Sequence, residues 1–146
     1  VIGNMWFLWI FGDNVEDRMG HQRFFVFYLL CGTGAAIGHV VMDPASVVPT
    51  IGASGAVAGV MGAYLVLYPR SRVLTLIPLI IFWDIIEVPA LLLLGVWFAL
   101  QVLSATMSAG GDPAIGGIAF VAHVAGFVLG VVGVFLFRKR RLVPRW

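Results

Sequence analysis

The chain has 146 residues, of which 61% are hydrophobic and only 11% are charged, and its mean hydropathy is +1.03. Soluble domains are usually about 25% charged and about 45–50% apolar, so this composition excludes a water-soluble globule and predicts an integral membrane protein. The single cysteine, Cys31, excludes an internal disulfide and any multi-cysteine metal site, and because it lies in an apolar run we expect it to be packed.

Five apolar segments follow one another along the chain, at residues 1–11, 24–41, 51–68, 88–104 and 117–137. A full span needs about 20 apolar residues, so the first segment is short, and we expect the chain to begin inside a helix. Residues 73–87 are apolar but contain Pro78, Asp84 and Glu87, which predicts an interfacial or re-entrant piece. The expected fold class is an all-α, multi-pass helical bundle.

All nine lysines and arginines fall in alternate connections: after the first segment, after the third and after the fifth. The connections at residues 42–50 and 105–116 contain none. Because cytoplasmic loops are enriched in Lys and Arg, we expect a membrane domain at residues 1–137 and a basic cytoplasmic tail at 138–146. No aromatic residues interleave with the basic run, so we expect contact with the lipid bilayer and no nucleic acid.

Glycines recur at helical spacing in two of the segments. Gly55, Gly59 and Gly62 fall on nearly one face of the third, and Gly126, Gly130 and Gly133 do so in the fifth. Small residues at such spacing let helix backbones approach closely in lipid. We therefore expect the third and fifth segments to be in contact, although this pattern alone has no catalytic content.

Ser54 and His123 lie on these two segments, and a serine becomes a nucleophile when a nearby histidine accepts its proton. The predicted topology places both, together with Asn4, at similar depth in the outer half of the membrane. Each alone has a structural explanation: a serine bonded to its own helix, a packed histidine, or an asparagine between helices. Their common depth favours a reaction site.

The remaining polar residues favour structural interpretations. We expect His21 in a solvated inner loop, His39 in an interfacial structural role, and Asp84 and Glu87 at the level of the headgroups. No Walker loop, dinucleotide fingerprint or HExxH motif is present, so we expect no cofactor and no metal.

The chain resembles the rhomboid intramembrane serine proteases along essentially its whole length. The residues that match, in order, are Asn4, Phe11-Gly12-Asp13-Asn14-Val15-Glu16, Gly20, Gly52-Ala53-Ser54-Gly55-Ala56 with Gly59 and Gly62, and Ala122-His123-Val124-Ala125-Gly126 with Gly130. The resemblance implies a rhomboid-like bundle with about five of the usual six spans. The first helix, the loop that follows it and the oxyanion histidine before Val1 are then missing, so we expect the fragment itself to be inactive or weak.

The resemblance also implies roles for individual residues. Ser54 would be the nucleophile and His123 its general base, in a dyad whose histidine is oriented by packing and not by an aspartate. Asn4 and the backbone N–H of Ser54 would stabilise the oxyanion. Structural support would come from Gly52, Gly55, Gly59 and Gly126. Glu16 would tie the inner ends of helices together, and Ala58 stands where some members carry a tyrosine that stacks on the histidine.

The implied function is a serine-type endopeptidase that cleaves transmembrane or membrane-proximal segments of membrane proteins. The expected location is a bacterial inner membrane, with the site toward the outer face. The main alternative is a non-catalytic relative that binds transmembrane clients, but such a protein needs neither Ser54 nor His123. A transporter or channel fragment would carry several ionisable residues at the midplane, and the chain has almost none.

Overall fold

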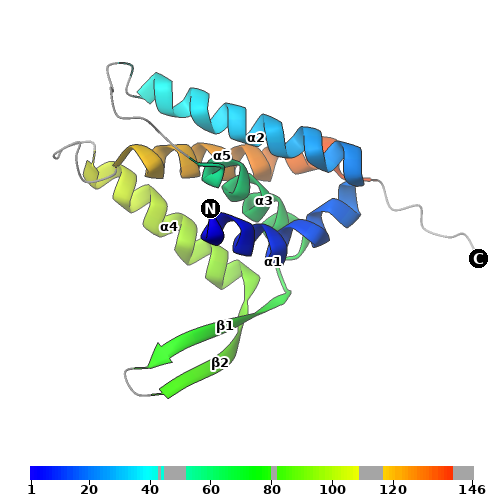
Figure 1. The fold of residues 1–146 in the computed structure, drawn as a ribbon, viewed down its shortest axis with the longest axis vertical. Helices are drawn as coiled ribbons and strands as arrows, with labels where there is room; N and C mark the ends of the chain where they lie inside the picture. The colour runs from blue at the N-terminus through cyan, green and yellow to red at the C-terminus, as the bar shows by residue number, and fades with distance from the viewer. Residues whose placement is uncertain (43, 45–51, 80–81, 109–116, 140–146) are drawn as a thin grey trace, which may run out of the picture.

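In a computed structural model, residues 1–42, 44, 52–79, 82–108 and 117–139 are described. These residues form five helices and one antiparallel hairpin (Figure 1). The elements are α1 (Ile2–Met19), α2 (His21–Met42), α3 (Ser54–Leu67), β1 (Arg72–Leu79), β2 (Phe82–Pro89), α4 (Ala90–Ser108) and α5 (Gly117–Phe137). The predicted all-α membrane bundle is therefore confirmed, with a hairpin added to it.

In the part of the chain that the structure describes, three helices are long and apolar enough to cross a membrane: His21–Met42, Ala90–Met107 and Phe120–Phe137. Their presence makes the chain a multi-pass membrane protein. The fourth apolar helix, α3, has 14 residues and is about 21 Å long, which is shorter than the roughly 30 Å hydrocarbon core.

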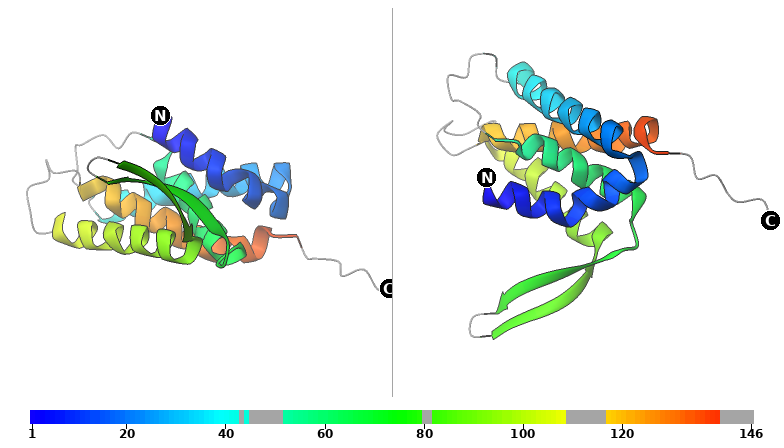
Figure 2. Two further views of the ribbon diagram at one scale, coloured as in Figure 1. Left: turned by 90° about the horizontal axis from the view of Figure 1, so that it is seen from below. Right: turned by 45° about the vertical axis from the view of Figure 1, so that its right-hand side comes forward.

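The central element of the bundle is α3. It lies among the other helices (Figure 2) and packs against α1, α2, α4 and α5. Its residues 55–64 are all buried. A helix that is apolar on every side is expected in the interior of a bundle, because no face of it has to meet water. The position of Ser54 at the start of α3 therefore depends on the other helices.

The predicted contact between the third and fifth apolar segments is confirmed. A methyl group built on Gly126 would overlap the carbonyl oxygen of Gly55, and one built on Gly130 would overlap that of Gly59. On α3, a methyl group on Gly62 would overlap the carbonyl oxygen of Phe127. Gly133 differs from the expectation, because its neighbour is the Phe27 ring of α2, 3.2 Å from the added methyl group.

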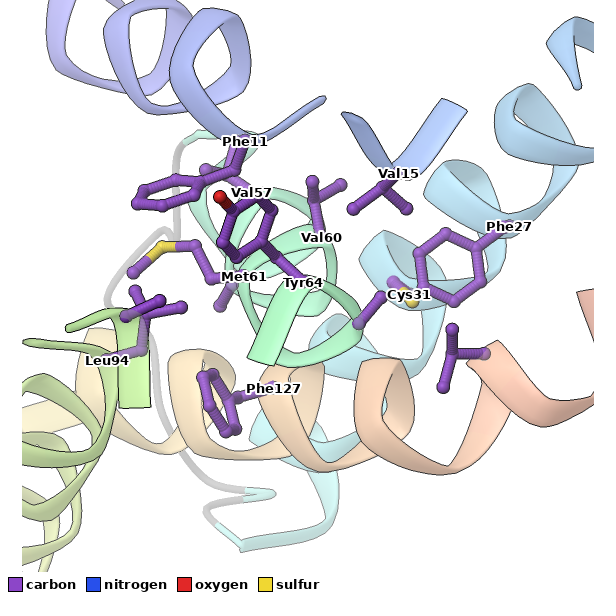
Figure 3. Packing of buried hydrophobic residues seen from close by; sticks show 14 of the residues in the cluster. Phe11, Val15, Phe27, Cys31, Val57, Val60, Met61, Tyr64, Leu94 and Phe127 are labelled. Carbon is purple, nitrogen blue, oxygen red and sulfur yellow. The ribbon is translucent and has the colours of Figure 1, made fainter. Parts of the chain in front are cut away.

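Large side chains fill the remaining space around α3 (Figure 3). The Phe11 ring of α1 meets the Tyr64 ring edge-on, with the ring centroids 4.9 Å apart. Cys31 is buried with 3% of its surface exposed, as expected for a packed thiol. Phe11 thus connects α1 to α3, and the Cys31 side chain of α2 lies against α3 at Gly59, so both neighbours help to fix the helix that carries Ser54.

The predicted loop between the first two helices is wrong. Arg18 lies within α1, and His21 is the first residue of α2, so only Gly20 separates the two helices. Gly20 has a φ of +85°, in the left-handed region that glycine adopts readily, and a single residue therefore reverses the chain. His21 is exposed, as expected, and it contacts the Glu16 carboxylate, which joins the end of α1 to the start of α2.

Helices α1, α3 and α5 each have basic residues in the last turn or shortly after it, and the three helices end close together. We call this part of the bundle, around Arg18, Tyr68 and Lys139, the basic end. The Lys139 backbone N–H donates to the Arg18 carbonyl oxygen at 2.7 Å, which joins the end of α5 to α1. The Tyr68 hydroxyl, after α3, donates to the Asn14 carbonyl oxygen at 3.0 Å. This grouping agrees with the predicted charge asymmetry. Residues 140–146 of the predicted tail, and most of the two predicted outer loops, lie outside the described residues.

Across the segment expected to be interfacial or re-entrant, residues 72–79 and 82–89 form the antiparallel strands β1 and β2, a secondary structure that was not predicted from the sequence. The hairpin extends away from the helices (Figures 1 and 2). Each strand of a two-stranded ribbon has a free edge, so Pro78 can lie in a strand without its missing N–H breaking a sheet. At the base, Arg72 pairs with Glu87 at 3.3 Å; the side chain of Asp84 lies outside the described residues.

The glycine contacts generate a stability prediction. We expect Gly130→Ala to destabilise the bundle by about 1–3 kcal/mol, because the added methyl group forces α3 and α5 apart. Gly95→Ala on α4 is the matched control, because nothing lies within 4 Å of its added methyl group. It should be neutral or slightly stabilising, since alanine favours helix. Unfolding of the two variants in detergent micelles measures the difference, and equal stabilities would contradict the close approach of the backbones.

Candidate active site

The three polar residues singled out from the sequence lie toward the same end of the bundle. Asn4 is in the first turn of α1, Ser54 is the first residue of α3, and His123 is about 9 Å along α5. The other ends of these three helices meet near Arg18, Tyr68 and Lys139, so their starts lie away from the basic end. All three side chains are half-buried.

Asn4 and Ser54 approach each other around Gly52. A methyl group built on Gly52 would lie 3.7 Å from the Asn4 Nδ2 and 3.9 Å from the Ser54 Oγ. It would also lie 4.0 Å from the Ser54 backbone nitrogen. Gly52 has a φ of +131°, a conformation that side-chain-bearing residues rarely adopt. Glycine therefore leaves open a small volume between a side-chain amide, a hydroxyl and a backbone N–H.

The start of α3 supplies backbone donors to this volume. Its first intrahelical hydrogen bond runs from the Val57 N–H to the Ala53 carbonyl oxygen, at 3.0 Å. The N–H of Ser54 precedes that bond and has no acceptor within the helix. The amino end of a helix also carries partial positive charge. Both properties favour a negatively charged oxygen beside Ser54.

The contact between α3 and α5 brings the turn of Ser54 against the turn of His123. A methyl group on Gly55 would lie 3.4 Å from the Ala122 carbonyl oxygen, and Gly126 lies directly over Gly55. Among the described residues, no hydrogen bond joins the Ser54 hydroxyl to the His123 imidazole. Hydrogen bonds of this kind are often loose in unliganded sites and shorten when substrate binds.

Two neighbours of His123 on α4 were not predicted from the sequence. The Gln101 Oε1 lies 2.8 Å from the His123 Nδ1, and the centroid of the Trp97 ring lies 5.9 Å from that of the imidazole. Residues four apart share one face of a helix, so Trp97 and Gln101 approach His123 together. The sequence gives one indication of this contact, which is the single glutamine in the apolar segment at residues 88–104. The aromatic neighbour comes from Trp97, whereas the α3 position considered from the sequence holds Ala58.

The other two histidines differ in their surroundings. His39 is buried in the last turns of α2, with 8% of its surface exposed, and the side chain of His21 is 94% exposed at the basic end. Within the described part of the chain, no group of three His, Cys, Asp or Glu side chains is arranged to hold a metal ion.

The family model described as the rhomboid domain matches residues 1–140. The chain belongs to the rhomboid family. Rhomboid protein 1, mitochondrial, of Saccharomyces cerevisiae is 30% identical over 133 residues, which cover 88% of this chain and 35% of that protein. Rhomboid-like protein 11, chloroplastic, of Arabidopsis thaliana is 32% identical over 143 residues, or 93% of this chain and 46% of that protein.

A third relative is the Rhomboid protease GluP of Bacillus subtilis, which is 38% identical over 65 residues. That alignment covers 44% of this chain and 12% of the relative. This rhomboid chain therefore spans less than half the length of these curated relatives. No solved structure gives a significant match to it.

The geometry around Gly52 generates a second prediction. We expect Gly52→Ala to destabilise this rhomboid bundle by about 1–3 kcal/mol, because alanine is strained at a φ of +131°. Gly3→Ala is the matched control on the neighbouring turn of α1, since nothing lies within 4 Å of its added methyl group. Unfolding in detergent measures both variants. A Gly52→Ala protein as stable as the control would show that the turn before Ser54 is not strained.

Proposed function

We propose that this rhomboid chain is the catalytic membrane domain of a serine-type endopeptidase that cleaves transmembrane or membrane-proximal segments of other proteins. Ser54 is the nucleophile and His123 is the general base. The observation that carries the proposal is the packing of Gly55 against Ala122 and Gly126, because it sets the first turn of α3 against the turn of His123. The neighbouring amide of Asn4 supports it.

The first step is acylation. The Ser54 Oγ attacks the carbonyl carbon of the scissile peptide while its proton passes to His123 Nε2. The carbonyl oxygen becomes an oxyanion, which accepts hydrogen bonds from the Asn4 side-chain amide and the Ser54 backbone N–H. The intermediate then collapses, the C–N bond breaks, and the amine leaves with the proton from the imidazolium.

The second step is deacylation. A water molecule gives a proton to His123 and attacks the acyl carbon, and the proton then returns to the Ser54 Oγ as the ester bond breaks. A substrate helix has its carbonyl groups bonded internally, so it must unwind locally to present one to Ser54. Segments with small or helix-breaking residues are therefore the favoured substrate class.

We further propose the orientation indicated by the charge pattern. The basic end of the bundle, where Arg18 and Lys139 meet, faces the cytoplasm of a bacterial cell, and the site around Ser54 faces the outer half of the inner membrane. Water for deacylation then reaches Ser54 from the outer side.

Covalent labelling tests the proposed function. In membranes that contain the full-length protein, we expect a fluorophosphonate probe to label Ser54 and inhibit cleavage of a transmembrane substrate. Ser54→Ala and His123→Ala should each abolish labelling, because the hydroxyl is a weak nucleophile without its base. His21→Ala is the matched control for the histidine change, since its exposed side chain lies at the other end of the bundle.

The outcomes separate the two classes of function. If Ser54 is not labelled, or is labelled equally after His123→Ala, the dyad is wrong. Co-purification of a transmembrane client without labelling would then indicate the non-catalytic alternative.

Asn4 is tested by its effect on turnover. We expect Asn4→Ala to lower kcat by about 10²–10³, because one oxyanion donor is lost, while KM changes little. Asn14→Ala is the matched control on the same helix, because the Asn14 amide is exposed and, among the described residues, bonds only the Ile10 carbonyl oxygen of its own helix. Steady-state cleavage of a detergent-solubilised substrate measures both. Equal kcat values for the two variants would remove Asn4 from the site.

A further inference from the structure

Among the described residues, His123 makes one polar side-chain contact, and that contact comes from a helix that carries neither Ser54 nor Asn4. The Oε1 of Gln101 on α4 lies 2.8 Å from the His123 Nδ1. An amide oxygen can only accept a hydrogen bond, so the imidazole nitrogen must be the donor. In a neutral imidazole a proton on Nδ1 leaves the lone pair on Nε2.

The face of α4 that carries Gln101 is fixed against α5 by aromatic contacts. The Phe98 and Phe127 rings are stacked with their centroids 4.5 Å apart. Trp97 lies between the two helices, 5.9 Å from the His123 ring and 6.0 Å from the Phe127 ring. Gln101 is one helical turn beyond this cluster. Its amide therefore lies on a face of α4 that packing holds next to the imidazole.

We propose that Gln101 is a positioning residue for the dyad. By accepting a hydrogen bond from Nδ1–H, it holds His123 in the tautomer whose Nε2 can take the proton of Ser54, and it limits rotation of the ring. A buried aspartate has this role in the usual triad, and replacing it with an amide that favours the wrong tautomer is severely damaging. This inference rests on the proposed function and adds to it the group that orients the base.

A purely structural role for Gln101 is the competing interpretation. Polar side chains between membrane helices often add stability through one hydrogen bond. Under that interpretation, loss of the amide would lower stability without changing turnover per folded molecule. The two interpretations therefore differ in kcat and in the tautomer of His123.

A series of variants in the full-length protein separates them. Gln101→Leu removes the acceptor at similar volume, and Gln101→Asn keeps an amide but withdraws it by one methylene group. We expect both to lower kcat by at least about 10-fold, and by no more than the roughly 10²–10⁴-fold that general base catalysis contributes in all, with KM little changed. Gln101→Glu retains an acceptor oxygen at the same reach, so it should recover most of the lost kcat.

Thr106→Val is the matched control on the same helix, because the Thr106 hydroxyl donates to the Leu103 carbonyl oxygen of its own turn, at 2.7 Å, and to no other described residue. It should leave kcat unchanged. All rates are normalised to folded protein, so a variant that folds poorly is still informative. If Gln101→Leu and Gln101→Asn keep the wild-type kcat, or if Gln101→Glu is as slow as Gln101→Leu, the proposal is overturned.

The ¹⁵N NMR signals of the His123 ring provide a readout that does not depend on activity. In the wild-type protein we expect a protonated Nδ1 and an unprotonated Nε2, and in Gln101→Leu an increased population of the other tautomer. An unprotonated Nδ1 in the wild type would overturn the proposal even in an active protease. If Nδ1 is protonated but the fluorophosphonate probe does not label Ser54, the hydrogen bond is established and the proposed function is contradicted.

Discussion

The close approach of α3 and α5 is the constraint on which the rest of the structure depends. Lipid offers no hydrophobic force to drive two apolar helices together, so their association relies on packing at short range. The glycines at 55, 59 and 62 on α3 and at 126 and 130 on α5 remove the side chains that would separate the backbones. Because Ser54 and His123 lie on these two helices, the same contact that stabilises the bundle sets the geometry of the site.

The length of α3 determines the depth of the site. A helix of 14 residues spans about 21 Å, roughly 9 Å less than the hydrocarbon core. In the proposed orientation α3 ends with its neighbours at the cytoplasmic surface, so its start would lie inside the bilayer and not at the outer surface. Backbone N–H groups at that depth have weakly polar surroundings, where a hydrogen bond to an anion is stronger than in water. Enclosure by the other helices is what permits a helix end there.

Much of this arrangement was predictable from sequence, because glycine spacing reports directly on helix contact in lipid. The ordered set of motifs from Asn4 through Gly52–Ala56 to Ala122–Gly126 indicated the rhomboid family, and the family model over residues 1–140 confirms it. The hairpin at residues 72–89 was missed because its strands are apolar on both sides and the segment has no Asn-Gly or Asp-Gly turn. Gln101 was not predicted to contact His123, because the position of a polar residue in an apolar helix does not indicate its partner. That partner lies 22 positions away along the chain.

The identity of the residue beside His123 follows from where the site lies. An ionised carboxylate at the centre of a membrane helix costs about 2.5–3.5 kcal/mol, whereas a neutral amide avoids that charge. An amide oxygen can still accept the Nδ1–H bond, so Gln101 can orient the imidazole without placing a net charge among apolar helices. An aspartate would also stabilise the imidazolium that forms during acylation, and an amide does so less well. In the proposed dyad, orientation by Gln101 would exchange some stabilisation of the charged base for a site that can be assembled within the bilayer, and Asn4 with the start of α3 would supply more of the transition-state stabilisation.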